Sequence, residues 1–366
     1  MKILKEQELK NVILGATVIG AGGGGSASSA LELLEKFKVN SGKEPELKLY
    51  NVEELEDDAY AAVTCGMGAP RALIGKDFTP YAVNAYGALQ DMAAKMGREV
   101  KYVLGVETGG FNTFVPMLIS LMTGIPFVNA DGAGRAVPAL DTLLLHVNGL
   151  KTSPLAMADN KNNRLKIELA DAHDASMGEN IGRWICTAFD MMAGLSGWMV
   201  TQDEIISSIA NNSVTYAMSI GETIAKYDGK GNVYDFIAKN SDLPCKPVCT
   251  GKIIKMETKT ANGFDYGVAI IAGEDGHEYK IPFQNENLAI YKDGTPIMTV
   301  PDIISVFNKE TGMPMTNADT AEGQYVDVGI AKVDEKWWKV GEAKMNEIWA
   351  PYFSNVEYTG KIIRFQ

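Results

Sequence analysis

The sequence predicts an α/β domain followed by a smaller β-rich domain. At about 100–200 residues per domain, a chain of 366 residues has room for about two domains. In the first part, short apolar runs alternate with stretches of helical spacing, which predicts a mostly parallel sheet covered by helices. In the later part, short alternating segments are separated by turn residues. We assign residues 1–245 to the α/β domain and 246–335 to the β-rich domain, and we expect the aromatic-rich tail 336–366 to pack back on the first domain.

The α/β domain is predicted to begin with two helices joined by glycines. Residues 5–19 place their apolar side chains at helical spacing. The glycines Gly20 and Gly22–Gly25 follow, and Ser26 is then a suitable N-cap for a second helix. Strands and helices alternate afterwards, with strands expected at 61–64, 102–106 and 125–128 and helices at 81–96, 114–122, 175–192, 203–209 and 214–227.

The β-rich domain is predicted to follow a boundary segment, 240–247, which contains serine, aspartate and two prolines. Its strands are expected at 251–259, 266–271, 278–282, 288–291 and 326–331. Turn dipeptides lie between or beside them: Asn262-Gly263, Asp275-Gly276, Asp293-Gly294 and Thr311-Gly312. From these short strands we expect a barrel or a small sandwich.

The composition excludes several classes of protein. The chain carries 34 Lys and Arg against 46 Asp and Glu, a net charge of −12, so we expect no nucleic-acid or anionic-membrane binding. Three histidines make a His-rich zinc site improbable, and four dispersed cysteines are too few for a disulfide framework. The charged N-terminus does not resemble a signal peptide, and no apolar run is long enough to span a membrane. We therefore expect a cytoplasmic protein.

The glycine run is the strongest local signal for a ligand site. Without Cβ atoms, Gly22, Gly23, Gly24 and Gly25 leave their backbone N–H groups open, just before a helix N-terminus that favours an anion or a carbonyl oxygen. The alternative interpretation is a tight helix–helix turn that needs positive φ angles. No Gly-Lys-Ser/Thr follows and a helix precedes the run, so the pattern favours neither a Walker loop nor a dinucleotide-binding fingerprint.

Two polar segments follow predicted strands. Glu107 and Asn112 come after the strand at 102–106, and Asp131 and Arg135 come after the next strand. Because the carboxyl ends of parallel strands share one edge of a sheet, we expect these residues to line one site. Two alternatives stay open: Glu107 is a solvated residue beside a helix cap, or Asp131 caps a helix and pairs with Arg135.

Two other segments extend this predicted site. The loop Cys65–Pro70 follows the strand at 61–64, but no partner base is evident for Cys65, so a buried free thiol is favoured over a nucleophile. In the β-rich domain, Asn285 and Glu286 belong to four adjacent polar residues. These residues either close over the site or form an exposed edge strand.

Five motifs occur in a fixed order along the chain: GAGGGGS, CGMGAP, VETGGFN, NADGAGRAVP and FQNENL. Their order and spacing resemble the bacterial domain-of-unknown-function family labelled S-methyl thiohydantoin desulfurase, found beside or fused to hydantoinase/oxoprolinase proteins. The resemblance extends from Gln7 to about Tyr358 and implies an α/β domain, a β-rich domain and hydrolysis of a five-membered cyclic ureide or its thio analogue. It supports as site residues Gly22–Gly25, Glu107, Asn112, Asp131, Arg135, Asn285 and Glu286, and it lends no support to Cys65.

These residues lead to the hypothesis of a hydrolase acting on a small hydantoin-like molecule. Glu107 or Asp131 would activate water, directly or through a divalent metal that they bind. The N–H groups of Gly22–Gly25 would stabilise the oxyanion, Arg135 would hold a substrate carboxylate, and Glu286 would close the site. The alternative is a non-catalytic, metabolite- or nucleotide-binding partner of a hydantoinase/oxoprolinase complex. We also expect a homo-oligomer.

Overall fold

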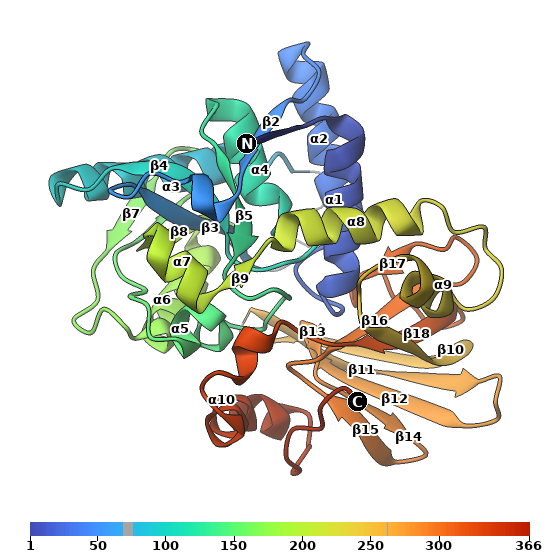
Figure 1. Ribbon diagram of the computed structural model, residues 1–366. Coiled ribbons are helices and arrows are strands. Elements are labelled where there is room, and N and C mark those ends of the chain that lie inside the picture. The colour runs from blue at the N-terminus through green and yellow to red at the C-terminus, as the bar shows by residue number, and fades with distance from the viewer. Residues whose placement is uncertain (69–75, 262) are drawn as a thin grey trace.

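The chain folds into two β-sheets, one mixed and covered by helices and the other antiparallel (Figure 1). This computed structural model describes residues 1–68, 76–261 and 263–366. The end of the expected Cys65–Pro70 loop and Asn262 of the expected Asn262-Gly263 turn lie outside the described residues. The predicted fold class, an α/β domain with a smaller β domain, is confirmed.

The N-terminal sheet consists of β1 (Lys2–Leu4), β2 (Leu47–Tyr50), β3 (Tyr60–Gly68), β4 (Val100–Gly105), β5 (Phe127–Asp131), β6 (Leu155–Ala158), β7 (Arg164–Ile167), β8 (Met192–Val200) and β9 (Ala210–Asn211). The strand order is β1-β2-β5-β4-β3-β8-β6-β7, with β9 paired to β5. The central strands β2, β5, β4 and β3 are parallel, and the flanking pairs are antiparallel. The carboxyl ends of β3, β4 and β5 therefore lie at one edge, as the site hypothesis requires.

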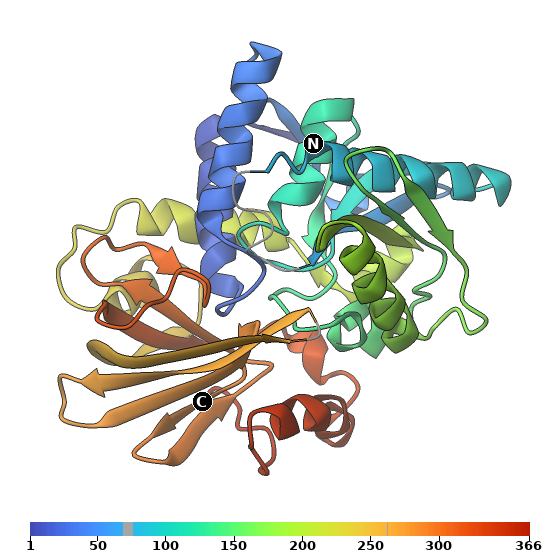
Figure 2. The same cartoon turned by 180° about the vertical axis from the view of Figure 1, so that it is seen from behind.

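The helices that accompany this sheet are α1 (Glu6–Ile19), α2 (Ala27–Ser41), α3 (Thr79–Lys95), α4 (Phe114–Thr123), α5 (Leu144–Val147), α6 (Ala175–Ala188), α7 (Gln202–Ser208), α8 (Ser213–Ile224) and α9 (Val233–Asn240). Helices α1 and α8 pack at a distance that requires glycine. A Cβ on Gly15 would lie 1.8 Å from the carbonyl oxygen of Ala217, and a Cβ on Gly221 would lie 1.9 Å from that of Asn11. The C-terminal end of α1 reaches the antiparallel sheet (Figure 2), so the glycine run that follows lies where the two domains meet.

The antiparallel sheet consists of β10 (Cys245–Ala261), β11 (Phe264–Gly273), β12 (Glu278–Gln284), β13 (Glu286–Asn287), β14 (Ala289–Lys292), β15 (Thr295–Thr299), β16 (Ile303–Asn308), β17 (Pro314–Met315) and β18 (Tyr325–Ala331). Its order is β15-β14-β12-β11-β10-β18-β16-β17, with β13 paired to β12. Within the described residues these strands make one open sheet, so the expected barrel or sandwich is wrong. Alternating side chains predict strands, but they do not determine which strands pair.

Strand β8 is the main element that the sequence analysis missed. Helix α6 ends at Ala188 rather than at residue 192, and Met192 begins a strand whose residues are all buried. Because both faces of β8 are covered, its side chains do not alternate between apolar and polar. Periodicity alone does not separate such a run from the apolar end of a helix.

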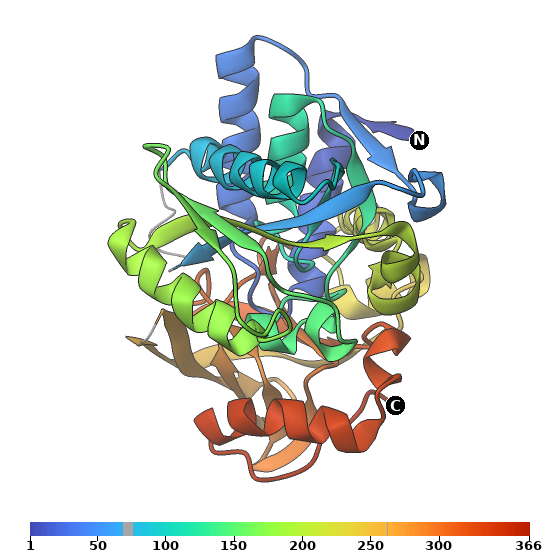
Figure 3. The same ribbon diagram turned by 90° about the vertical axis from the view of Figure 1, so that its left-hand side faces the viewer.

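The C-terminal tail carries helix α10 (Glu342–Asn355), which lies below α6 in the view of Figure 3. Ahead of this helix, the indole N–H of Trp337 donates to the carbonyl oxygen of Ala133 at 2.8 Å. Within the helix, the Tyr352 hydroxyl donates to Asp141 at 2.5 Å. Trp337 and Tyr352 are buried in one apolar cluster with residues of the N-terminal sheet. The tail is thus packed against the N-terminal domain.

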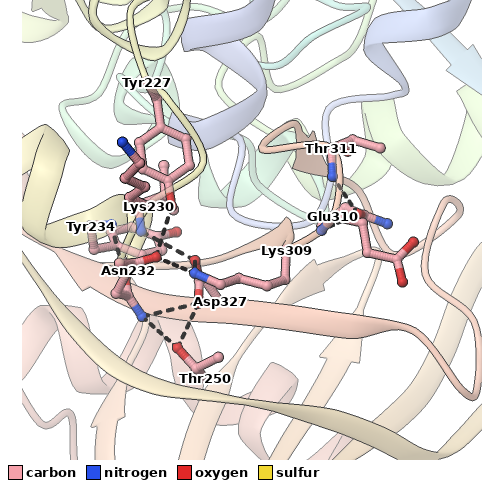
Figure 4. A network of polar contacts seen from close by, with 12 residues as sticks. Tyr227, Lys230, Asn232, Tyr234, Thr250, Lys309, Glu310, Thr311 and Asp327 are labelled. Carbon is pink, nitrogen blue, oxygen red and sulfur yellow. Dashed lines mark hydrogen bonds and ion pairs between the residues drawn. The ribbon is translucent and has the colours of Figure 1, made fainter.

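Asp327 anchors helix α9 to the antiparallel sheet (Figure 4). Its buried carboxylate accepts hydrogen bonds from the Thr250 hydroxyl at 2.6 Å and from the Val233 N–H at 3.1 Å. Lys309 forms an ion pair with it at 3.1 Å, and the Asn232 amide donates to it at 3.2 Å. Buried carboxylates need such partners, and here they join the α8–α9 segment to β10 and β18.

Two further observations bear on the chemistry open to this chain. All four cysteines are buried free thiols. In the described part of the chain, no helix combines the length and the apolar character needed to cross a membrane. The reaction proposed below uses none of these thiols.

Candidate functional site

A cavity lies where the α/β domain meets the antiparallel sheet. Its volume is about 120 Å³, of the same order as the roughly 150 Å³ of an engineered cavity that holds benzene. The expected site residues in its wall are Gly22–Gly25, Glu107, Asn112, Asn285 and Glu286. The structure thus brings residues from all five motifs to one surface, although CGMGAP contributes only its Cys65–Gly68 part and NADGAGRAVP only Val137 and Pro138.

Glu107 enters this cavity from the carboxyl end of β4. Its side chain is buried, with Oε1 accepting from the Asn112 amide at 2.6 Å and Oε2 accepting from the Val137 N–H at 2.8 Å. Burial raises the pKa of Glu107 to about 7 against these two hydrogen bonds, and the nearby Asp131 charge raises it further. The alternative of a solvated capping residue is therefore wrong. A carboxylate that exchanges its proton near neutral pH is suited to act as a general base.

Glu286 enters the cavity from β13 of the opposite domain. Its Oε1 accepts from the Gly24 N–H at 3.3 Å, whereas its Oε2 is buried without a hydrogen-bond partner in the described residues. Burial, followed by the charge of Glu107, raises the pKa of Glu286 well above its usual value. Burial thus favours the protonated form of Glu286, which carries a proton that it can donate into the cavity. The alternative of an exposed edge strand is wrong, because Glu286 is buried.

The four consecutive glycines are explained by close neighbours. A Cβ at these positions would lie less than 3 Å from Asn287 and Asn317 (Gly22), Glu286 (Gly23), Gly109 (Gly24) and Phe111 (Gly25). Side chains at this turn would thus displace the very groups that form the cavity. Two of the four N–H groups are already engaged, since Gly23 donates to Gly20 and Gly24 donates to Glu286. Both interpretations of the run therefore hold in part: it is a tight turn, and it lines the cavity.

Asparagine side chains hold the two acidic groups in place. Asn112 donates to Glu107 and accepts from the Gly66 N–H at 3.0 Å, so its orientation is determined from both ends. Asn285 adopts a φ of 55°, a left-handed conformation that asparagine tolerates, and its side chain accepts from the Asp265 N–H at 2.9 Å. This backbone turn at Asn285 directly precedes Glu286 and orients it toward the first domain.

Asp131 and Arg135 do not line the cavity within the described residues. Asp131 accepts from the Thr108 hydroxyl at 2.6 Å and from the N–H groups of Ala133 and Gly134, so it closes the loop that follows β5. Arg135 is fully buried and donates to backbone carbonyl groups, including Ala136 at 2.7 Å. No ion pair joins Asp131 to Arg135 in the part of the chain that the structure describes. The loop turns both side chains away from the space where substrate would bind.

Glu107 and Asp131 are without a third metal-ligating side chain among the described residues. Each of their carboxylate oxygens accepts a hydrogen bond from an N–H or O–H donor, and Asp131 lies outside the described cavity wall. No group of three or more His, Cys, Asp or Glu side chains suited to a metal occurs among the described residues. The chemistry below therefore uses no metal-dependent step.

An ion pair in the cavity wall was not predicted. Glu179 and Arg183 lie one turn apart on α6, and Arg183 Nε donates to Glu179 Oε1 at 2.6 Å. The other oxygen of Glu179 accepts from the Leu140 N–H at 3.1 Å. The sequence did carry a signal for this pair, because the expected helix at 175–192 places residues four apart on one face.

Two family models match nearly the whole chain. The "S-Me-THD-like, N-terminal domain" matches residues 7–168, and the "S-Me-THD-like, C-terminal domain" matches residues 173–359. The chain belongs to the S-Me-THD-like family. This agrees with the resemblance noted from the five motifs. The family models divide the chain before α6, whereas the antiparallel sheet begins only at Cys245.

A solved structure shares the fold of this S-Me-THD-like protein. The X-ray crystal structure of a protein from Chromobacterium violaceum has a TM-score of 0.84 and 23% sequence identity, with 100% of both chains covered. At this identity the likeness supports the fold alone. None of the curated proteins compared with the chain matches it.

Proposed function

We propose that this protein hydrolyses the exocyclic carbon–sulfur bond of a hydantoin-like ring, with an S-methyl thiohydantoin as the substrate type. The observation that carries the proposal is the pair of carboxyl groups in one cavity, Glu107 and Glu286, held in different environments. Glu107 receives two hydrogen bonds that favour its ionised form, whereas the burial of Glu286, with one unpartnered oxygen, favours its protonated form. Such divergence assigns one group as base and the other as acid. The family name supports the choice of ring.

The reaction needs one water molecule and both carboxyl groups. As the water oxygen bonds to the ring carbon that bears the methylthio group, Glu107 takes a proton from water and Glu286 protonates the ring nitrogen. The carbon–sulfur bond then breaks. Glu107 gives its proton to the departing sulfur, and the intermediate's hydroxyl returns a proton to Glu286. The products are methanethiol and the hydantoin, and both carboxyl groups regain their starting states.

The rest of the wall suits the uncharged part of such a substrate. Met67, Phe78 and Phe111 line the cavity and offer an apolar, polarisable surface for a methylthio group. Phe78 and Phe111 pack edge-on with ring centroids 5.2 Å apart, which holds this surface rigid. Burial of Glu107 and Glu286 beside these rings excludes bulk water and strengthens their electrostatic effect.

The test is the release of methanethiol from an S-methyl thiohydantoin by the purified protein. We expect methanethiol and hydantoin in equal amounts from the wild type and little turnover from the Glu107→Gln/Glu286→Gln double variant. Asp159→Asn, a buried carboxylate outside the cavity, is the matched control and should retain activity. A wild-type protein that turns over no hydantoin or thiohydantoin alone, but that supports turnover when co-expressed with a hydantoinase-type subunit, would favour the alternative partner role.

A further inference from the structure

Arg183 brings a positive charge into a cavity whose other charged side chains are acidic. It is the one Lys or Arg in the described cavity wall, and the carboxyl-bearing residues there are Glu107, Glu179, Asp265 and Glu286. Without Arg183, the wall would repel an anionic substrate. Arg183 shares this wall with Glu107 and Glu286, so the cation belongs to the same cavity as the reacting groups.

The guanidinium group of Arg183 is held in one orientation. Its Nε donates to Glu179 at 2.6 Å, and its Nη1 donates to the Gly263 carbonyl oxygen at 2.7 Å. The guanidinium carbon lies 4.3 Å from the ring centroid of Phe264. A Cβ on Gly263 would approach Arg183 Cδ to 2.9 Å, so glycine leaves room for this arrangement. A positioned guanidinium loses little entropy when it binds a ligand.

One nitrogen of Arg183 remains open to a ligand. Within the described residues Nη2 has no hydrogen-bond partner, yet it is not one of the fully buried unpartnered atoms. An uncommitted guanidinium N–H in a partly dry cavity is a strong donor to a carboxylate. Arg135 also has an unpartnered Nη2, but that atom is fully buried and the side chain lies outside the described cavity wall.

We propose that Arg183 binds an anionic arm of the substrate, so that the enzyme selects five-membered rings bearing a carboxylate. This inference rests on the proposed hydrolysis of the carbon–sulfur bond and adds which class of substituted ring is the substrate. Arg183 Nε donates to Glu179 and its Nη1 donates to the Gly263 carbonyl oxygen, so Nη2 is left to donate to the substrate carboxylate. Arg183 is a specificity-determining residue and takes no part in proton transfer.

The experiment compares an acid with its neutral isostere. The substrates are an S-methyl thiohydantoin with a carboxymethyl group on ring carbon 5 and the corresponding primary amide. We expect the wild type to prefer the acid in kcat/KM by about tenfold or more, the range of a hydrogen bond to a charged group. The Arg183→Met/Glu179→Gln double variant removes both charges of the ion pair and should bring this ratio close to one. Arg98→Met, which removes an arginine stacked on Tyr60 outside this cavity, should leave the ratio unchanged.

The outcomes separate this inference from the proposed function. Turnover of both compounds with no preference for the acid overturns the role of Arg183 and leaves the proposed hydrolysis of the carbon–sulfur bond standing. If neither compound is turned over, calorimetry with hydantoin-5-acetic acid and its amide tests Arg183 by binding alone. Equal affinity of the wild type for these two probes would overturn the inference. Arg183→Lys, which keeps the charge, should retain part of the preference for the acid. This variant tests the role of Arg183 if the double variant fails to fold.

Discussion

Glu107 and Asp131 follow neighbouring parallel strands at the same edge of the same sheet, and both are buried. Only Glu107 reaches the cavity. Its oxygens are held by Asn112 and by a backbone N–H from a different loop, which aim the carboxylate across the domain interface. Asp131 instead accepts N–H groups two and three residues further along its own loop. A place at the carboxyl edge of a sheet therefore does not suffice for a role in the cavity.

The largest expected effect comes from removing the charge of Glu107. Glu107→Gln keeps the size of the side chain but cannot accept a proton from water, and we expect kcat to fall by about 10²- to 10⁴-fold. Single-turnover assays of methanethiol release measure it. A loss of less than tenfold would remove Glu107 from the role of base.

Gly23→Ala tests whether the glycine run positions the second carboxyl group. The new Cβ would lie 1.8 Å from Glu286 Oε1, so the acid must move, and we expect roughly a 100-fold loss of kcat/KM from misplacement. Gly87→Ala on α3, whose nearest neighbour would be 3.8 Å away, is the control and should keep full activity. Equal activity of both variants would show that Glu286 needs no exact placement.

The pH profile should show two limbs. Turnover needs ionised Glu107, so kcat/KM should fall about tenfold per pH unit below about 7, where Glu107 gains its proton. Turnover also needs protonated Glu286. Because the pKa of Glu286 is raised, the loss of its proton should lower turnover on the alkaline side of the profile. The charged groups that act on Glu107 are Asp131, which raises its pKa, and Arg135, which lowers it, and Glu107 in turn raises the pKa of Glu286. A profile that rises continuously from pH 5 to pH 10 would exclude Glu286 as the acid.

Asp131→Asn should act on stability more than on catalysis. The amide can no longer accept from all of its present donors, and an unsatisfied buried group costs about 1–3 kcal/mol of unfolding free energy. Urea unfolding measures this loss beside a kcat assay. A drop in kcat as large as that of Glu107→Gln, with unchanged stability, would return Asp131 to the catalytic role that the sequence suggested.

The smallest expected effect is that Glu286→Gln makes the protein more stable at high pH. The pKa of Glu286 is raised on folding, so above the unfolded value of about 4.3 the folded state holds a proton that the unfolded state has lost. Its contribution to stability is complete below that value and is lost as pH rises. Glu286→Gln does not titrate, so its unfolding free energy should exceed that of the wild type at pH 8. At pH 4 the difference should be smaller. A pH-independent difference would contradict the raised pKa.

The sequence determined the local elements and part of the site. The periodicity of residues 5–19 and the cap at Ser26 correspond to α1 and α2, where Ser26 does accept the Ser28 N–H. The position of Glu107 after an apolar run placed it at the correct sheet edge. Strand β8 was missed because a strand covered on both faces has no alternation. These signals depend on residues within one or two turns of each other, which is the range over which periodicity and capping act.

The tertiary structure alone decided which groups meet. Gly24 and Glu286 are 262 residues apart in sequence, and only the packing of the two domains joins them. The same packing leaves Arg135 behind the wall and puts Arg183 in it, although both arginines follow polar stretches of similar character. The pKa values of Glu107 and Glu286 depend on burial between the domains, because desolvation comes from atoms that are distant in sequence. Composition and spacing named the carboxyl groups, and burial between the domains raised the pKa of both.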